Sequence, residues 1–177
     1  MPYIMKEFRP PFDVVIDSFP MEELNIEVVH TLVLELSRAY ADAHGGNYAA
    51  YNRVVGVLTC ASLEFARITE TLLTGDMGVD LEELGDGAIS QVQMEAVSRF
   101  IDAMPLASMV AGDLNYVITK LMHRITLEHA EERREVIIEV LLMTLSDVVY
   151  DLYVETIAPY EETKIAANGP VSELGQP

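Results

Sequence analysis

The side chains best suited to chemistry are carboxylates that recur at helical spacing late in the sequence. Glu135 and Glu139 are four residues apart, and so are Asp147 and Asp151. Each pair therefore lies on one face of a helix. Carboxylates from facing helices hold Mg²⁺ against a substrate phosphate, so these four residues are the candidate metal ligands. With 29 acidic residues in 177, the same spacing is also typical of a solvated acidic face.

The enzyme hypothesis that uses these residues is a Mg²⁺-dependent, all-α nucleotide pyrophosphatase, with Mg²⁺ as its only cofactor. That class pairs two acidic doublets on consecutive helices, and no second doublet stands out in this sequence. The sequence has no phosphate-binding glycine loop, serine elbow or kinase motif. Its four histidines lack the spacing of a helical zinc site, and Cys60 lies among apolar residues, as a structural thiol does. The sequence therefore favours a protein without catalytic activity and without a cofactor, and the pyrophosphatase is the alternative.

A second candidate site consists of polar and aromatic residues at two predicted helix starts. Its members are Tyr48, Tyr51, Asn52, Asp113, Asn115 and Tyr116. Free amides at a helix N-terminus attract anions, and tyrosine rings stack on flat groups. If the two starts approach each other, they form a ligand-binding site for a small nucleotide-like molecule, with Arg53, Arg67 or Lys120 balancing its charge. The structural alternative is that Asp113 caps its helix and the tyrosines fill a seam between helices.

The elements that position these residues are predicted to be helices. Apolar residues recur every three to four positions over 24–40, 48–68, 91–104, 114–125 and 136–152, and no alternation of period two appears. Gly45–Gly46 is a helix end, and Asn47 and Ser90 are helix caps. The polar stretch 128–135 fits a turn or a continuing helix, and Pro159 is expected to end the last helix. The predicted fold class is all-α.

The sequence also repeats itself. Residues 16–20 (IDSFP) match residues 101–105 (IDAMP), 85 positions later. At the same offset, Val29, Leu32, Val33 and Leu36 fall on Leu114, Val117, Ile118 and Leu121, and a shift of two residues aligns Leu58, Glu64 and Phe65 with Leu145, Asp151 and Leu152. The repeat predicts a helical bundle of two pseudo-symmetric helical hairpins, joined by short helices and related by a pseudo-twofold axis.

Several motifs carry a resemblance to a known family. They are MPYI (1–4), RPPFD (9–13), YNxxVGVLxCxxLEF (51–65), GDLNYVIT (112–119) and APYE (158–161) followed by Lys164. The chain resembles a small, uncharacterised family of phage and prokaryotic proteins that begin MPYI. Members of that family carry each motif once, whereas here the motifs are shared between the halves. The resemblance implies a fused, asymmetric version of a protein that otherwise pairs with itself, and it implies no established activity.

The repeat and the composition together give the expected domain organisation. Residues 1–75 form the first hairpin repeat, 76–90 a linker rich in glycine and acidic residues, and 91–177 the second repeat with a C-terminal tail. Half of the residues are apolar, which suits one compact unit. A single cysteine excludes a disulfide within the chain and favours a reducing compartment.

Charge and hydropathy narrow the range of partners. The formal charge is −18, which disfavours direct binding to nucleic acid or to anionic membranes. The sequence has no membrane span, and its start lacks the apolar core of a secretory signal, so we expect a cytoplasmic protein, in the host if it is viral. The expected role is a phage-type accessory protein that binds a small nucleotide-like ligand or a host protein. An acidic mimic of nucleic acid is a further alternative, and a homo-oligomer is left open.

Overall fold

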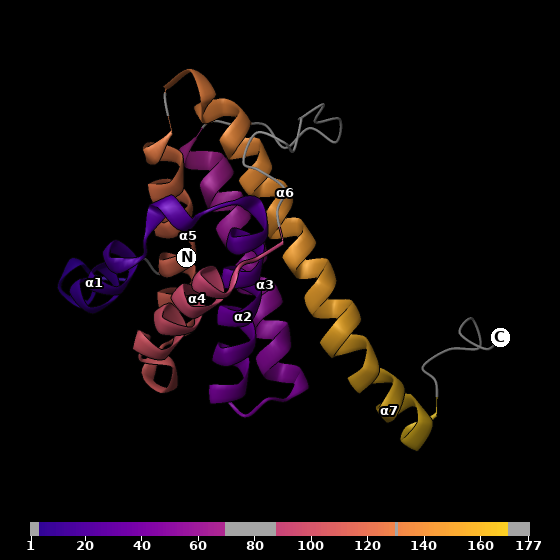
Figure 1. Cartoon of the computed structure of the whole chain (residues 1–177). Helices are drawn as coiled ribbons and strands as arrows, with labels where there is room; N and C mark the ends of the chain where they lie inside the picture. Colours follow the sequence, from indigo (N-terminus) through magenta and orange to yellow (C-terminus); the bar gives the residue numbers. More distant parts are fainter. Residues whose placement is uncertain (1–3, 70–87, 130, 170–177) are drawn as a thin grey trace.

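The computed structural model describes residues 4–69, 88–129 and 131–169, and every regular element in these ranges is helical (Figure 1). The α-helices are α1 (Pro10–Ser18), α2 (Ile26–Ala43), α3 (Tyr48–Ile68), α4 (Gln91–Ala103), α5 (Ala111–Glu128), α6 (Arg134–Leu152) and α7 (Ala158–Asn168). The all-α prediction is confirmed. Most of the predicted linker at 76–90 lies outside the described residues.

Local signals in the sequence set the helix boundaries. The side chain of Asn47 accepts a hydrogen bond from the Ala50 amide at 3.1 Å, and Ser90 forms a capping box with Gln93. Gly45 and Gly46 have φ angles of 103° and 54°, in the left-handed region that glycine tolerates, and they end α2. The predicted caps and the predicted end of α2 are confirmed.

The two halves repeat each other element by element. Helix α5 begins and ends 85 residues after α2, and the short 3₁₀ turns Met21–Glu23 and Leu106–Ser108 keep the same offset. The repeat includes a histidine pair that the sequence analysis missed. The Nδ1 atoms of His44 and His129 each lie 2.8 Å from the carbonyl oxygen four residues earlier. The structure therefore supports a duplicated unit.

The two halves make equivalent contacts with each other, as a pseudo-twofold axis requires. Helix α3 packs against α5, and its counterpart α6 packs against α2, while α3 and α6 meet in the centre. Each short helix lies on the opposite half, α1 on α5 and α4 on α2. The core at these contacts is fully buried, with Leu32, Phe65, Leu121 and Leu152 all at 0% exposure. Neither half buries its apolar face by itself.

One helix boundary that the sequence left open is now resolved, and another differs from the prediction. The polar stretch 128–135 contains a 3₁₀ turn at Glu131–Arg133, so it is a turn between α5 and α6. The prediction that Pro159 ends the last helix is wrong, because a π-helical turn at Tyr153–Ile157 leads into α7. Pro159 lies in the first turn of α7, where its missing amide is tolerated. Helices α6 and α7 form the long arm in orange and yellow in Figure 1.

Candidate functional site

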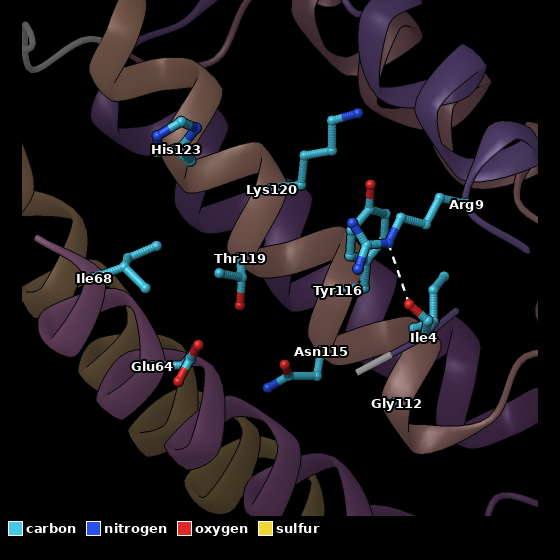
Figure 2. A pocket seen from close by; sticks show the side chains of 10 residues that line it. All are labelled: Ile4, Arg9, Glu64, Ile68, Gly112, Asn115, Tyr116, Thr119, Lys120 and His123. Atoms are coloured by element: carbon cyan, nitrogen blue, oxygen red, sulfur yellow. Dashed lines mark hydrogen bonds between the residues drawn. The ribbon is translucent and has the colours of Figure 1, made fainter. Parts of the chain in front are cut away.

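A cavity lies in the seam between α3 and α5. We call it the seam cavity; it measures about 330 Å³, and the ten side chains labelled in Figure 2 line it. Glu64 and Ile68 come from the end of α3, five residues from Asn115 to His123 come from α5 at helical intervals, and Ile4 and Arg9 close one end. A cavity of this size accommodates a small molecule.

A charged network joins α1 to α5 at one wall of the seam cavity. The Tyr116 hydroxyl donates to Asp13 Oδ1 at 2.7 Å, and Lys120 Nζ lies 2.6 Å from the same oxygen. The Arg9 guanidinium lies over the Tyr116 ring, 5.1 Å from its centroid, and Arg9 Nε donates to the Ile4 carbonyl (Figure 2). Within the described residues Arg9 has no ion pair at contact distance, but its positive charge helps to lower the pKa of Asp13.

The network changes the protonation behaviour of its members. Partial burial works against the charge of Asp13, but hydrogen bonds from Lys120 and Tyr116 outweigh it and lower the pKa of Asp13. Burial, the hydrogen bond to Asp13 and the negative charge of Asp13 raise the pKa of Tyr116 to about 12. At neutral pH Asp13 is therefore ionised and Tyr116 keeps its proton.

Two polar atoms on α5 are buried without a hydrogen-bond partner among the described residues. They are Asn115 Nδ2 and Thr119 Oγ1, and both side chains point toward α3 in Figure 2. Glu64, on the facing helix, binds Arg67 through both carboxylate oxygens at 2.9 Å and 2.7 Å, which lowers the pKa of Glu64. A buried polar atom without a partner costs about 1–3 kcal/mol, so each one needs an explanation. Ser37 Oγ on α2 is a third such atom, and it does not line the seam cavity.

In the equivalent seam, between α2 and α6, the corresponding polar side chains pair with one another. His30 and Asp151 are the counterparts of Asn115 and Glu64, and His30 Nε2 lies 3.1 Å from Asp151 Oδ2. Arg38, the counterpart of His123, binds Glu35 at 2.8 Å and also binds Glu155. Burial opposes the charge of Arg38, but these two hydrogen bonds outweigh it and raise its pKa.

The structure separates the six predicted ligand-binding residues. Asn115 and Tyr116 line the seam cavity together with Lys120. Asp113 accepts a hydrogen bond from the Val110 amide at 2.8 Å and so caps α5. The other three lie at the start of α3, about 18–24 Å along the helix axis from Glu64. Tyr48 stacks on Tyr160, Tyr51 donates to Asp42, and Asn52 is exposed.

The four candidate metal ligands lie along α6. Glu135 and Asp147 are exposed, Glu139 is half-buried, and Asp151 pairs with His30. Over residues 4–69, 88–129 and 131–169, no group of three or more histidine, cysteine, aspartate or glutamate side chains is arranged to hold a metal ion. None of the helices in those ranges combines the length and the apolar content that a bilayer crossing needs.

Sequence reasoning missed Arg9, Glu64 and Thr119 as residues of the seam cavity. Arg9 is 107 positions from Tyr116 in the sequence, and only the packing of α1 on the opposite half brings the two together. A signal for Thr119 was present in the repeat. Aligning the halves at offset 85 puts Thr119 on Leu34, and a polar residue opposite a buried leucine marks a position where the two seams differ.

Comparison with known proteins identifies one family. The sequence model of the domain of unknown function DUF6899 matches residues 1–71 and 87–171, and these two segments coincide with the two halves of the repeat. No curated protein matches the chain. No solved structure matches it either.

Proposed function

The chain belongs to the DUF6899 family, and we propose that it is a non-enzymatic binding protein whose seam cavity holds a small, flat, nucleotide-like anion. The motif resemblance adds a phage-type accessory role to the proposal. The observation that carries it is the pair of buried, unpartnered atoms, Asn115 Nδ2 and Thr119 Oγ1, at the wall of a cavity. A ligand acceptor within reach of both atoms would remove their desolvation cost.

The side chains around the seam cavity support this ligand class. Tyr116 offers a flat ring, Arg9 and Lys120 offer positive charge, and Asn115 and Thr119 offer hydrogen-bond donors. Only 11 of the 177 residues are lysine or arginine, so two cations at one cavity stand out against a formal charge of −18. Glu64 lines the same cavity and Asp13 pairs with Lys120, so Arg9 is the cation that would balance a bound anion.

The test is calorimetry and thermal unfolding of the full chain with the four ribonucleoside monophosphates and phenyl phosphate. A bound probe at about 100 times its Kd should stabilise the fold by about 2.7 kcal/mol. Asn115→Leu, which keeps the size and removes the amide, should weaken binding by about tenfold. His30→Leu, at the equivalent position of the other seam, is the matched control and should leave affinity unchanged.

Two results would contradict the proposal. One is equal loss of binding in Asn115→Leu and His30→Leu, which would place the ligand outside the seam cavity. The other is Mg²⁺-dependent consumption of a nucleotide that Asp147→Asn or Asp151→Asn abolishes. That outcome would favour the pyrophosphatase alternative.

A further inference from the structure

A second, larger hollow adjoins the seam cavity. This apolar groove, of about 690 Å³, lies between the chain before α1 and the start of α5, and Met5, Phe8, Phe12, Pro105 and Val110 are among its lining residues. Several of these apolar side chains are unusually exposed: Met5 is 58%, Phe8 57% and Val110 63% accessible. Apolar side chains gathered in this way on a surface mark a site where something apolar binds.

The groove and the seam cavity adjoin each other and share two lining residues. Ile4 and Gly112 line both, and in Figure 2 they lie together at the end of the cavity beyond Tyr116 and Asn115. Gly112 has no side chain at this junction, whereas its counterpart in the other half is Glu27, an exposed carboxylate. The polar groups Arg9, Asn115 and Thr119 occupy one end of the combined space, and the exposed apolar side chains occupy the other.

From this arrangement we infer that the ligand is an amphiphile, with its anionic, flat head in the seam cavity and a linear apolar chain in the groove. The inference rests on the proposed function, because the seam cavity must hold the head. A polar hollow and an apolar hollow that adjoin at Ile4 and Gly112 match the two ends of such a molecule. An apolar chain gains affinity with each methylene removed from water, and this gain does not depend on the hydrogen bonds of the head.

The experiment measures Kd by calorimetry for a homologous series on the full chain. The probes are phenyl phosphate and its 4-ethyl, 4-butyl and 4-hexyl derivatives, each kept below its aggregation concentration. A fully buried methylene would improve Kd by about fourfold, and we expect about twofold per methylene in a groove open to solvent on one side. Hexanol, which carries the chain without the head, should bind far more weakly than 4-hexylphenyl phosphate.

Two variants test whether the apolar chain of the ligand occupies the groove. The double variant Phe8→Asn/Val110→Asn should bind phenyl phosphate as the parent chain does and lose most of the gain along the series. Both side chains are largely exposed, and asparagine already occupies the position equivalent to Val110, where Asn25 caps α2, so the variant should fold. Val92→Asn on α4 replaces another exposed valine, 56% accessible, and should keep the full gain.

Each contrary outcome has a distinct meaning. Binding of phenyl phosphate with no gain along the series would overturn the amphiphile and leave the proposed function intact. No binding of any phosphate probe would overturn both. Two further results would place the apolar chain of the ligand outside the groove. One is an undiminished gain in affinity along the series in the double variant, and the other is hexanol bound as tightly as 4-hexylphenyl phosphate. Dimerisation in sedimentation experiments that the double variant abolishes would instead assign the groove to a second copy of this chain.

Discussion

The two seams of the bundle have the same helical construction and different side chains, although α2 also carries one buried polar atom without a partner, Ser37 Oγ. In the α2–α6 seam, His30 pairs with Asp151, Arg38 bridges two carboxylates, and Leu34 is buried. In the α3–α5 seam, Asn115 and Thr119 have buried polar atoms without partners among the described residues. The backbone repeat therefore does not require the seam cavity. The side chains at a few equivalent positions create it.

Under the proposed function, this difference assigns stability to one seam and binding to the other. Closing a seam with ion pairs and leucine leaves few polar groups to bind anything else. Leaving donors unpaired weakens the fold slightly, and natural proteins accept such a cost where a site needs it. The charged wall of the seam cavity has no counterpart in the other half, because the positions on α4 equivalent to Arg9 and Asp13 are Met94 and Ser98.

The largest expected effect tests whether both seams depend on one core. Phe65→Ala on α3 and Leu152→Ala on α6 remove equivalent side chains that are both 0% exposed. Each should lower the free energy of unfolding by about 3–5 kcal/mol, measured by urea unfolding. Because α1 and α4 each lie on the opposite half, both variants should unfold in a single transition followed equally by circular dichroism and tyrosine fluorescence. Two separate transitions would mean that the halves are independent.

The sequence predicted the helical framework well because its signals are local. Apolar spacing, Asn47, Ser90 and Gly45–Gly46 located helices and caps without knowledge of the packing. Pro159 misled because a π-helical turn before it starts a new helix, and proline is tolerated in the first turn of that helix. The spacing of apolar residues does not reveal such a turn.

The candidate site was predictable only in part. Asn115 and Tyr116 were found because they lie in an unusual polar motif at one helix start. Arg9 reaches Tyr116 only because α1 packs on the opposite half, and periodicity does not specify which half a short helix joins. The start of α3 was paired with the start of α5 on symmetry alone, and the axial stagger between α3 and α5 separates Tyr48 from Asn115.

A second prediction sharpens the contrast by making the open seam more like the closed one. Thr119→Val keeps the shape of the side chain and removes the unpartnered hydroxyl, so it should raise the free energy of unfolding by about 1–2 kcal/mol. It should also weaken phosphate binding. Urea unfolding and calorimetry measure the two effects. Thr31→Val, on the equivalent helix face of α2, is the control. An equal rise in its free energy of unfolding would mean that the unpartnered hydroxyl of Thr119 has no particular cost.

A third prediction concerns the charged wall between α1 and α5. Lys120→Met removes the ammonium group from Asp13 and should lower the free energy of unfolding by about 1 kcal/mol at pH 7. The folded-state pKa of Asp13 lies below its unfolded value of 3.8, so this stabilisation is present above that pH and is lost as pH falls through the folded pKa. Urea unfolding should therefore show the parent and the variant converging once the pH falls below the folded-state pKa of Asp13. A difference that persists there would mean that lost packing, rather than charge, weakens the variant.

The smallest effect exchanges the caps of the two equivalent helices. The Asn25 side chain accepts a hydrogen bond from the Val28 amide at 2.9 Å, whereas Val110 at the start of α5 offers no side-chain acceptor. Val110→Asn should therefore raise the free energy of unfolding by about 0.5 kcal/mol, and Asn25→Val should lower it by about 1 kcal/mol. The asymmetry follows because Asp113 already accepts from the Val110 amide, so only part of a capping box is missing. A stabilised Val110→Asn would show that the apolar residue at this start is retained at the expense of a better cap. A Val110→Asn that is not stabilised would mean that the start of α5 needs no side-chain acceptor, and the contrast between the two helix starts would then carry no information about binding.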